Sequence, residues 1–334
     1  MAKAGRSNGL TDVGGILVGH FTDTKAVCGV TAVVCPPGAV AGVDVRGSAP
    51  GTRETDLMAP HNLIEKAQAV VLSGGSVFGL SAADGVTRWL AEQGYGFPID
   101  QGHVVPIVPA AVLYDLGRGA DFIPPIRADW GRWACKNAGD YPVETGNVGA
   151  GTGAFSHSIK GCLGTASLIL DSGIAVAALV AVNSDGSVIN PDSGRPWEIG
   201  MEVDGEFGDQ GKRAVRLPAP PPPEPVKNTT IGVITTDALL SVAQAQKVAQ
   251  MAHDGMARAI RPAHTMFDGD TIFCLATGKK ELPAKDGFFI SPRALSLNEL
   301  GHAAANCMTR AIIGAVLKAE SLAGMTAFRD LEDR

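Results

Sequence analysis

Apolar residues after position 228 recur first at strand-like and then at helix-like spacing. The run "TTIGVITTD", which follows Asn228 directly, is β-branched and apolar and favours a strand. From Ser241 the apolar residues recur every three or four positions, which predicts a helix that Arg261-Pro262 ends. The residues with this spacing are Val242, Ala245, Ala249, Ala252, Met256 and Ile260.

The same alternation continues to the end of the chain. The run "DTIFCLATG" predicts a second strand, and Ser296 and Glu299 have capping-box spacing at the start of a second helix. Upstream, a helix is expected around "VFGLSAADGVTRWLAEQG", closed by Gly94. Several earlier runs are apolar throughout, as expected for strands covered on both faces: "GVTAVVCPPG", "AVVLSGG", "HVVPIVPAAVLYDL" and "ASLILDSGIAVAALVAVN".

A proline-rich segment, "PAPPPPEP" at residues 218–225, separates the two parts of the chain. Such a segment is extended and solvated and cannot join a sheet. It could connect two domains, or it could be an exposed loop before a processing site.

The composition is that of a packed protein. Hydrophobic residues make up 45% of the 334 residues and charged residues 19%, a length that suits one large domain or two small ones. The formal net charge is -6 without a dense basic block, which argues against binding to nucleic acid or to an anionic membrane. No apolar run has the length of a membrane span.

Two further features bear on the compartment. The first residues, "MAKAGRSNGLTDVGG", are not followed by an apolar run typical of a secretory signal, so we expect a cytoplasmic protein. The six cysteines form no C-x-x-C pair and favour buried thiols over a disulfide framework (Cys28, Cys35, Cys135, Cys162, Cys274, Cys307).

The glycines and histidines do not have the spacing that motifs for nucleotide or metal binding require. Neither Gly211-Lys212 nor Gly278-Lys279 completes a Walker A loop, and "GNVGAGTGAFS" misses the G-x-G-x-x-G pattern. The seven histidines contain no H-E-x-x-H arrangement. We therefore expect no cofactor and no metal.

Asn228-Thr229-Thr230, between the proline-rich segment and the strand, allows three interpretations. It matches the N-glycosylation pattern, which requires a secretory route. The two threonines could simply open the strand. The third interpretation is self-cleavage: Thr229 Oγ1 attacks the Asn228 carbonyl, and hydrolysis of the ester leaves Thr229 with a hydroxyl and a free α-amine. An α-amine, with a pKa of about 7.7–8.0, can take the hydroxyl proton near neutral pH.

Motifs along nearly the whole chain, from "LTDVGGILVGH" to about Gly324, resemble the DmpA-type family. That family contains self-processing aminopeptidases and nylon-oligomer hydrolases. The resemblance rests on "GTRETDL", "LSGGSVFGLSAADGV", "PIVPAAVLYDL", "NTTIGVITTD" and "RPAHTMFDGDTIFCLATG", which occur in the family's order.

The resemblance implies a single αββα four-layer sandwich, as in DmpA and ornithine acetyltransferase. It also implies cleavage into residues 1–228 and 229–334, two fragments that stay associated as one folded unit. Family members form oligomers of such pairs, often tetramers. The implied substrate is a short peptide or an amino-acid-derived amide or oligomer.

The resemblance also assigns the nucleophile and its carboxylates. Thr229 stands where the nylon-oligomer hydrolases have Thr and the characterised aminopeptidases have Ser. Asp268 and Asp270 match carboxylates that support the nucleophile in the nylon-oligomer hydrolases. From the residues alone, Asp268-Gly269-Asp270 is equally typical of a turn before a strand.

Three upstream positions match residues that surround the family's nucleophile. Tyr114 and Asn183 would donate hydrogen bonds to an oxyanion, and Lys160 would steady developing charge or lower neighbouring pKa values. Taken singly, each has a simpler explanation: an amphipathic core residue, a turn former and a solvated loop charge. No histidine lies at a matched position.

The expected reaction is amide hydrolysis through an acyl-enzyme on Thr229. Two alternatives remain at this point: acyl transfer of the ornithine acetyltransferase kind, and an uncleaved, non-enzymatic α/β binding protein. Away from the nucleophile and the Asp pair the chain departs from the nylon-oligomer hydrolases, so the substrate is open.

Overall fold

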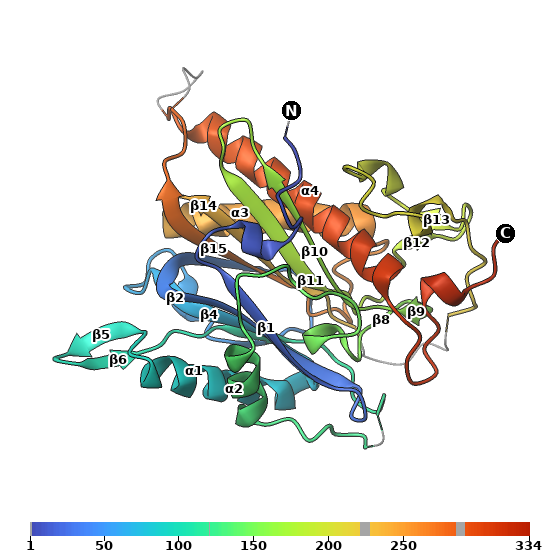
Figure 1. Ribbon diagram of the computed structural model, residues 1–334, viewed down its shortest axis with the longest axis horizontal. Coiled ribbons are helices and arrows are strands. Elements are labelled where there is room, and N and C mark those ends of the chain that lie inside the picture. The colour runs from blue at the N-terminus through green and yellow to red at the C-terminus, as the bar shows by residue number, and fades with distance from the viewer. Residues whose placement is uncertain (1, 120, 221–227, 285–290) are drawn as a thin grey trace.

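The structure, a computed structural model, describes residues 2–119, 121–220, 228–284 and 291–334 (Figure 1). In this part of the chain, nine strands form one sheet in the order β10-β11-β14-β15-β2-β4-β7-β3, with β1 paired to β2. The strands are β1 (Leu17–Asp23), β2 (Cys28–Val45), β3 (Gly51–Arg53), β4 (Lys66–Ser73), β7 (Ala110–Val112), β10 (Leu163–Ile169), β11 (Ala175–Ala181), β14 (Ile231–Ala238) and β15 (Thr271–Lys280).

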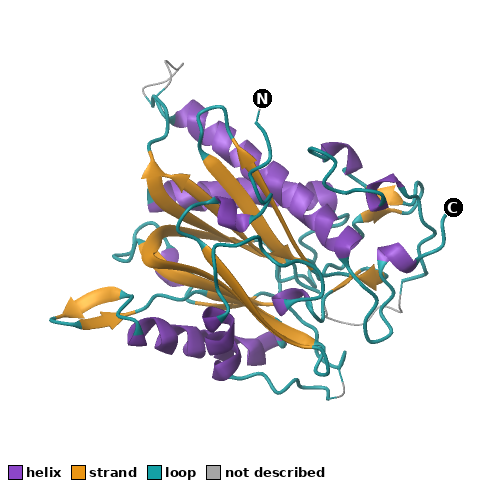
Figure 2. Cartoon of the chain, viewed as in Figure 1, coloured by secondary structure: helices purple, strands orange, loops and turns teal. Residues whose placement is uncertain are grey.

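Helices lie on the two outer sides of this sheet (Figure 2). They are α1 (Ala82–Glu92), α2 (Ala128–Lys136), α3 (Val242–Ala259) and α4 (Ala294–Lys318). Among the described residues, three short hairpins lie outside the main sheet: β5 (Phe97–Asp100) with β6 (His103–Val105), β8 (Phe155–Ser156) with β9 (Ile159–Lys160), and β12 (Ile189–Asn190) with β13 (Arg195–Pro196).

The sheet bends into two layers at β2, its longest strand. The first part of β2 pairs with β1 and β4, and its last part pairs with β15. Between these parts the register with β4 shifts, from Val34 opposite Ala69 to Ala39 opposite Ala67. The extra residues include Pro36, Pro37 and Gly38, whose φ of 81° suits glycine. A bulge with two prolines thus interrupts the β2–β4 pairing at the point where the sheet divides into two stacked layers.

The described part of the chain has three separate apolar cores, which lie between four layers. One core lies between α1 and α2 and the strands β2 and β4, and a second lies between the two layers of the sheet. A third lies between the β10-β11-β14-β15 layer and helices α3 and α4. The αββα class expected from the resemblance is confirmed, with the two central layers joined through β2 rather than separate.

Alternating side chains on β15 show how one strand serves two cores. Phe273 and Leu275 point into the core between the sheet layers, whereas Ile272, Cys274 and Ala276 pack toward α3 and α4. All are almost fully buried. A strand covered on both faces must be apolar throughout, which is why the strand was visible in the sequence.

The predicted strand–helix–strand–helix order after residue 228 is confirmed, with one correction. Helix α3 begins after Ser241, whose hydroxyl accepts from the Gln244 N–H in a capping box. Helix α4 begins at Ala294, so the predicted capping box at Ser296 and Glu299 is wrong. Ser296 instead lies within the first turn of α4, and its hydroxyl donates to the Pro283 carbonyl at 2.7 Å.

Three other expectations can be compared with the structure. The predicted helix over 77–94 is a 3₁₀ turn, Ser76–Ser81, followed by α1, with Gly94 at φ 76° just beyond it. All six cysteines are free and buried. Residues 221–225 of the proline-rich segment lie outside the described residues.

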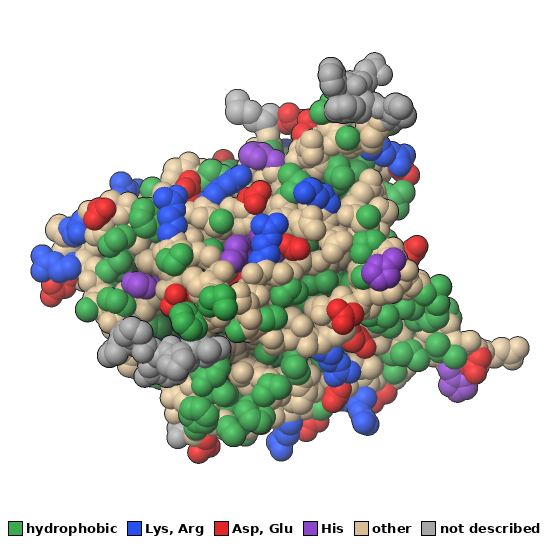
Figure 3. Space-filling view, turned by 180° about the vertical axis from the view of Figure 1, so that it is seen from behind, with side chains coloured by type: hydrophobic (Ala, Val, Ile, Leu, Met, Phe, Trp, Pro, Cys, Tyr) green, Lys and Arg blue, Asp and Glu red, His purple; other side chains and the backbone are tan. Residues whose placement is uncertain are grey.

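The surface and the helices give two further findings. On the face opposite to that of Figure 1, described side chains of both charges are interspersed among apolar ones (Figure 3). Within the described residues, no helix is long and apolar enough to cross a membrane.

Candidate active site

Three strand ends meet at the start of β14. β14 lies between β11, its antiparallel neighbour, and β15, its parallel neighbour. Thr229 is two residues before β14, Asn183 is two residues after β11, and Asp270 immediately precedes β15. Sheet topology therefore brings together residues that are far apart in the sequence.

Thr229 is held by both neighbouring strands. Its N–H donates to the Asn183 carbonyl at 2.6 Å, and its Oγ1 accepts from the Gly269 N–H at 3.1 Å. The Thr229 hydroxyl also donates to the carbonyl oxygen of Asn228. Only 5% of Thr229 is exposed, so both its main chain and its hydroxyl are fixed in place.

Gly269 allows this close approach because it has no side chain. A Cβ at position 269 would lie 2.9 Å from Thr229 Oγ1 and 2.7 Å from the Ala49 carbonyl oxygen. The Ala49 N–H in turn donates to the Asp268 carbonyl at 2.9 Å. The glycine between the two aspartates is therefore required by packing against the threonine, beyond any need for a turn.

Asp270 connects the segment before β14 to His264. Its Oδ1 accepts from the Thr230 N–H at 2.8 Å. Its Oδ2 accepts from the His264 N–H at 3.1 Å and lies 2.7 Å from His264 Nδ1. Asp270 is 2% exposed, so burial and three nearby donors fix its carboxylate beside the start of β14.

Asp268 is also buried, and its hydrogen bonds are different. Its Oδ2 accepts from the N–H and the hydroxyl of Thr265 at 2.9 and 2.6 Å, and its Oδ1 accepts from the Asp185 N–H at 3.4 Å. Burial, followed by the nearby Asp270 charge, raises the pKa of Asp268 to about 6. This carboxyl group therefore titrates just below neutral pH.

The side chain of Asn183 has a fixed orientation. Its Oδ1 accepts from Arg118 Nη1 at 2.5 Å and from the Phe155 N–H at 3.0 Å. Its Nδ2 donates to the Tyr114 carbonyl at 3.1 Å. Two donors on one end and an acceptor on the other determine which end carries the nitrogen.

Arg118 was not singled out in the sequence. Its guanidinium contacts Asn183 and the Gly153 carbonyl and lies 5.8 Å from the centre of the Phe155 ring. Burial lowers the pKa of Arg118 to about 10, which leaves it charged at neutral pH, and the nearby Asp115 opposes this shift. The positive charge of Arg118 beside Asn183 Oδ1 makes the amide N–H groups of Asn183 better hydrogen-bond donors.

Tyr114 and Lys160 lie near Asn183 but contact their surroundings differently than expected. Tyr114 reaches Asn183 through its carbonyl, and its hydroxyl makes no hydrogen bond within the described residues. Lys160 is fully buried, and its Nζ donates to three carbonyls, those of Gly151, Ala154 and Gly161. Burial lowers the pKa of Lys160 to about 7. Its hydrogen bonds brace residues 151–161 and do not reach Thr229.

His264 is a neighbour that sequence reasoning missed. Its backbone has a φ of 58°, in the left-handed region, and its ring meets that of His253 edge-on at 4.9 Å. Burial lowers the pKa of His253 to about 4, which keeps that ring neutral. A lone histidine six residues before Asp270 gave no sequence signal, because the contact depends on the turn between them.

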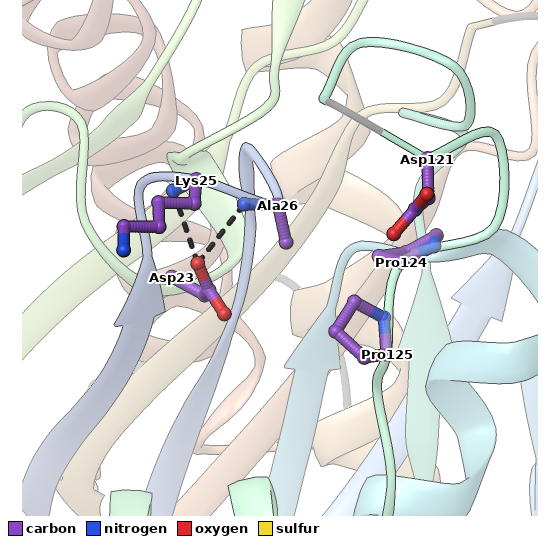
Figure 4. Close-up of a pocket in the computed structure, with 6 residues that line it drawn as sticks. All are labelled: Asp23, Lys25, Ala26, Asp121, Pro124 and Pro125. Carbon is purple, nitrogen blue, oxygen red and sulfur yellow. Dashed lines mark hydrogen bonds between the residues drawn. The ribbon is translucent and has the colours of Figure 1, made fainter.

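A small hollow near the β1–β2 turn is separate from this site. It is lined by Asp23, Lys25, Ala26, Asp121, Pro124 and Pro125 (Figure 4). The Asp23 carboxylate accepts from the N–H groups of Lys25 and Ala26, so it closes the turn. None of the candidate site residues lines this hollow. Elsewhere in the described residues, no group of three His, Cys, Asp or Glu side chains is placed to hold a metal ion.

Comparison with known proteins gives consistent matches over almost the whole chain. A model of peptidase family S58 matches residues 8–329. An uncharacterised aminopeptidase of Mycobacterium tuberculosis is 46% identical over 97% of this chain and 98% of its own length. A 6-aminohexanoate-oligomer endohydrolase of Kocuria is 29% identical, with 94% and 87% covered.

Two solved structures share the fold. The L-aminopeptidase D-Ala-esterase/amidase of Ochrobactrum anthropi, described as a variant of the Ntn hydrolase fold, matches with a TM-score of 0.70 and 22% identity, covering 96% of this chain and 88% of that one. A β-aminopeptidase of Burkholderia matches with a TM-score of 0.71 and 23% identity, with 98% and 92% covered.

Proposed function

The chain belongs to peptidase family S58 and is a hydrolase of peptide or amide bonds, and we propose that Thr229 is its nucleophile. The proposal includes self-cleavage between Asn228 and Thr229, which would free the Thr229 α-amine. Family membership sets aside the non-enzymatic alternative.

One observation carries the proposal: the Thr229 hydroxyl is buried against the carbonyl that it would attack. The hydroxyl contacts the Asn228 carbonyl oxygen, while Gly269 holds Oγ1 from the other side. In the first step Oγ1 bonds to the Asn228 carbonyl carbon, the peptide C–N bond breaks, and the hydroxyl proton passes to the nitrogen, which becomes the Thr229 amine. Water then hydrolyses the ester, leaving an Asn228 carboxylate.

Turnover would repeat the same attack on a substrate amide. The Thr229 α-amine removes the hydroxyl proton and returns it to the leaving amine, and water releases the acyl group. Asn183 Nδ2, oriented by Arg118, would stabilise the oxyanion. The Asp268 and Asp270 carboxylates would hold the ammonium form of the α-amine near the strand end.

The names of the relatives suggest a class of substrate, whereas the proposed assembly and location come from the sequence. We propose short peptides or amino-acid-derived amides and oligomers as substrates, and a tetramer of two-fragment units in the cytoplasm. Acyl transfer of the ornithine acetyltransferase kind is the remaining alternative. Adding an amine acceptor during turnover separates the two, because a transferase would yield the acylated amine instead of the free acid.

The test compares the wild-type protein with Thr229→Ala on a denaturing gel and in an amide-hydrolysis assay. The wild type should give two fragments, and the smaller one should begin at Thr229 by N-terminal sequencing. Thr229→Ala should stay whole and inactive. Full amidase activity in Thr229→Ala, or a wild-type chain that stays intact after long incubation at neutral pH, would refute the proposal.

A further inference from the structure

The side chain of Asn228 makes a contact that the attack by Thr229 does not require. Its Nδ2 donates to Asp185 Oδ1 at 3.2 Å. The Asp185 N–H donates to Asp268 Oδ1 at 3.4 Å, which ties this aspartate to the nucleophile's surroundings. A partly exposed carboxylate thus lies on the acyl side of the Asn228–Thr229 bond.

Asn228 occupies the position that a substrate's acyl group takes during turnover. In the proposed self-cleavage, Asn228 becomes the acyl group of an ester on Thr229 Oγ1. In turnover, the substrate's acyl group forms an ester on the same oxygen. Groups that surround Asn228 before cleavage are therefore the groups that a substrate's acyl residue meets afterwards.

The Asn228 amide marks where a substrate amine can sit. Its Nδ2 is separated from the carbonyl carbon by four bonds, through Cα, Cβ and Cγ. The amine of a γ-amino acyl group is four bonds from its carbonyl carbon as well. Replacing a neutral amide by an ammonium turns the contact with Asp185 into a charge-assisted hydrogen bond.

We propose that Asp185 binds the free ammonium group of the substrate, and that the preferred substrates are amides of γ-amino acids. This inference rests on the proposed function, because it requires acylation of Thr229. It adds a residue and a chain length to that function: hydrolysis should be fastest when the amine is four bonds from the scissile carbonyl.

The experiment measures kcat/KM for 4-aminobutyryl-p-nitroanilide and for butyryl-p-nitroanilide, which lacks only the amine. A hydrogen bond to a charged group predicts that the wild type favours the amine-bearing substrate by roughly 10- to 150-fold. Asp185→Asn keeps an oxygen that accepts from Asn228, so it should still mature, yet it should lose this preference. Asp192→Asn, an exposed aspartate, serves as the matched control and should retain it.

A second variant tests the chain length. Asp185→Glu extends the carboxylate by one methylene and should move the optimum from 4-aminobutyryl to 3-aminopropionyl p-nitroanilide. Equal wild-type rates on the two butyryl substrates, or a preference that survives Asp185→Asn, would overturn the inference and leave Thr229 as nucleophile. Absence of both the Thr229 fragment and hydrolysis would instead overturn the proposed function, and this inference with it.

Discussion

At the residue scale, the backbone and the hydroxyl of Thr229 are each held by a different neighbouring strand end. Asn183 accepts the Thr229 N–H, and Gly269 donates to Oγ1. Each contact uses the backbone of the neighbour, so these two contacts hold Thr229 without any neighbouring side chain. The side chains of Asn183, Asp268 and Asp270 are therefore not needed for these two contacts and can serve the proposed reaction.

Asn183→Ala should lower kcat about a hundred- to a thousandfold with little change in KM, as expected for a donor that acts mainly in the transition state. The variant also removes the acceptor of Arg118 and of the Phe155 N–H. Thermal unfolding should therefore be measured in parallel. A change confined to KM would assign Asn183 to ground-state binding.

The pH dependence should report the Asp268–Asp270 pair. Burial and the Asp270 charge raise the pKa of Asp268 to about 6, so Asp268 becomes ionised only as the pH rises through that value. We expect Asp268 to give a rise in kcat/KM near pH 6, below a second rise from deprotonation of the Thr229 α-amine, whose unperturbed pKa is about 7.7–8.0. Asp270→Asn removes the like charge, lowers the pKa of Asp268 and should shift the rise near pH 6 to lower pH.

The control for this experiment is Asp268→Asn, which should remove the rise near pH 6 and leave the rise that comes from deprotonation of the Thr229 α-amine. His264 contacts Asp270 directly, so a shift on replacing His264 is also expected and would not identify a histidine base. If the rise near pH 6 is unchanged in both aspartate variants, ionisation of Asp268 and Asp270 does not control turnover.

At the element scale, the ends of β11, β14 and β15 converge because of their order in the sheet. The long β2 supports this edge, since Arg46 and Gly47, just after β2, donate to the Asp270 carbonyl at 3.0 and 3.2 Å. A Cβ on Gly47 would lie 2.2 Å from the Asp270 N and 2.3 Å from the Asp268 carbonyl oxygen. The segment around Asp268 is thus clamped between β14 and the segment after β2.

Gly269→Ala should slow self-cleavage and hydrolysis together, because its Cβ would push against Thr229 Oγ1 at 2.9 Å. A displacement of about 1 Å at a reacting group can cost roughly a hundredfold in rate. The measurements are the cleaved fraction over time on a denaturing gel and kcat of the matured protein. Gly200→Ala, where a Cβ meets nothing within 4 Å, is the matched control. Wild-type rates in Gly269→Ala would show that the contact is dispensable.

Sequence patterns predicted the strands that are buried on both faces and the helix that buries one clear apolar stripe. β14, α3 and β15 were predicted because their apolar spacing follows directly from their packing against two cores. The start of α4 was misplaced, because Arg293 at its N-cap makes no side-chain capping bond. Helix α2, nine residues with two tryptophans, was not anticipated at all.

The candidate site was only partly predictable for a different reason. Thr229, Asn183 and the two aspartates were found through motifs. Arg118 and Asp185 join the candidate site through contacts across 65 and 83 residues, and no local pattern encodes such pairings. Lys160 was found by its motif, but its three carbonyl partners depend on a loop fold that periodicity does not predict.

At the scale of the whole molecule, the proposed cut falls inside one continuous sheet. β14 and β15, from the part after residue 228, lie between β11 and β2, from the part before it. The core between the sheet layers and the core under α3 and α4 both contain residues of the two parts. The core under α1 and α2 contains only residues before 228, whereas the described residues after 228 contribute only to the two shared cores.

The two fragments should therefore co-elute as one particle in gel filtration without denaturant. The smaller holds 106 of the 334 residues, about 11 kDa of 34.4 kDa, and the larger about 23 kDa. They should separate only when denaturant disrupts the shared sheet. Separate elution under native conditions would contradict the prediction.

The position of β14 and β15 in the middle of the sheet also has a kinetic consequence. Before the cut, each strand reaches its neighbours by closing a loop within a single polypeptide. After the cut, the same pairing needs an encounter between two molecules, each with unpaired strand edges exposed to aggregation. We therefore expect the precursor to recover from denaturation at any dilution, and the matured enzyme to recover poorly and in a concentration-dependent way. Maturation would make the fold irreversible, so that the enzyme's lifetime is governed by its unfolding rate.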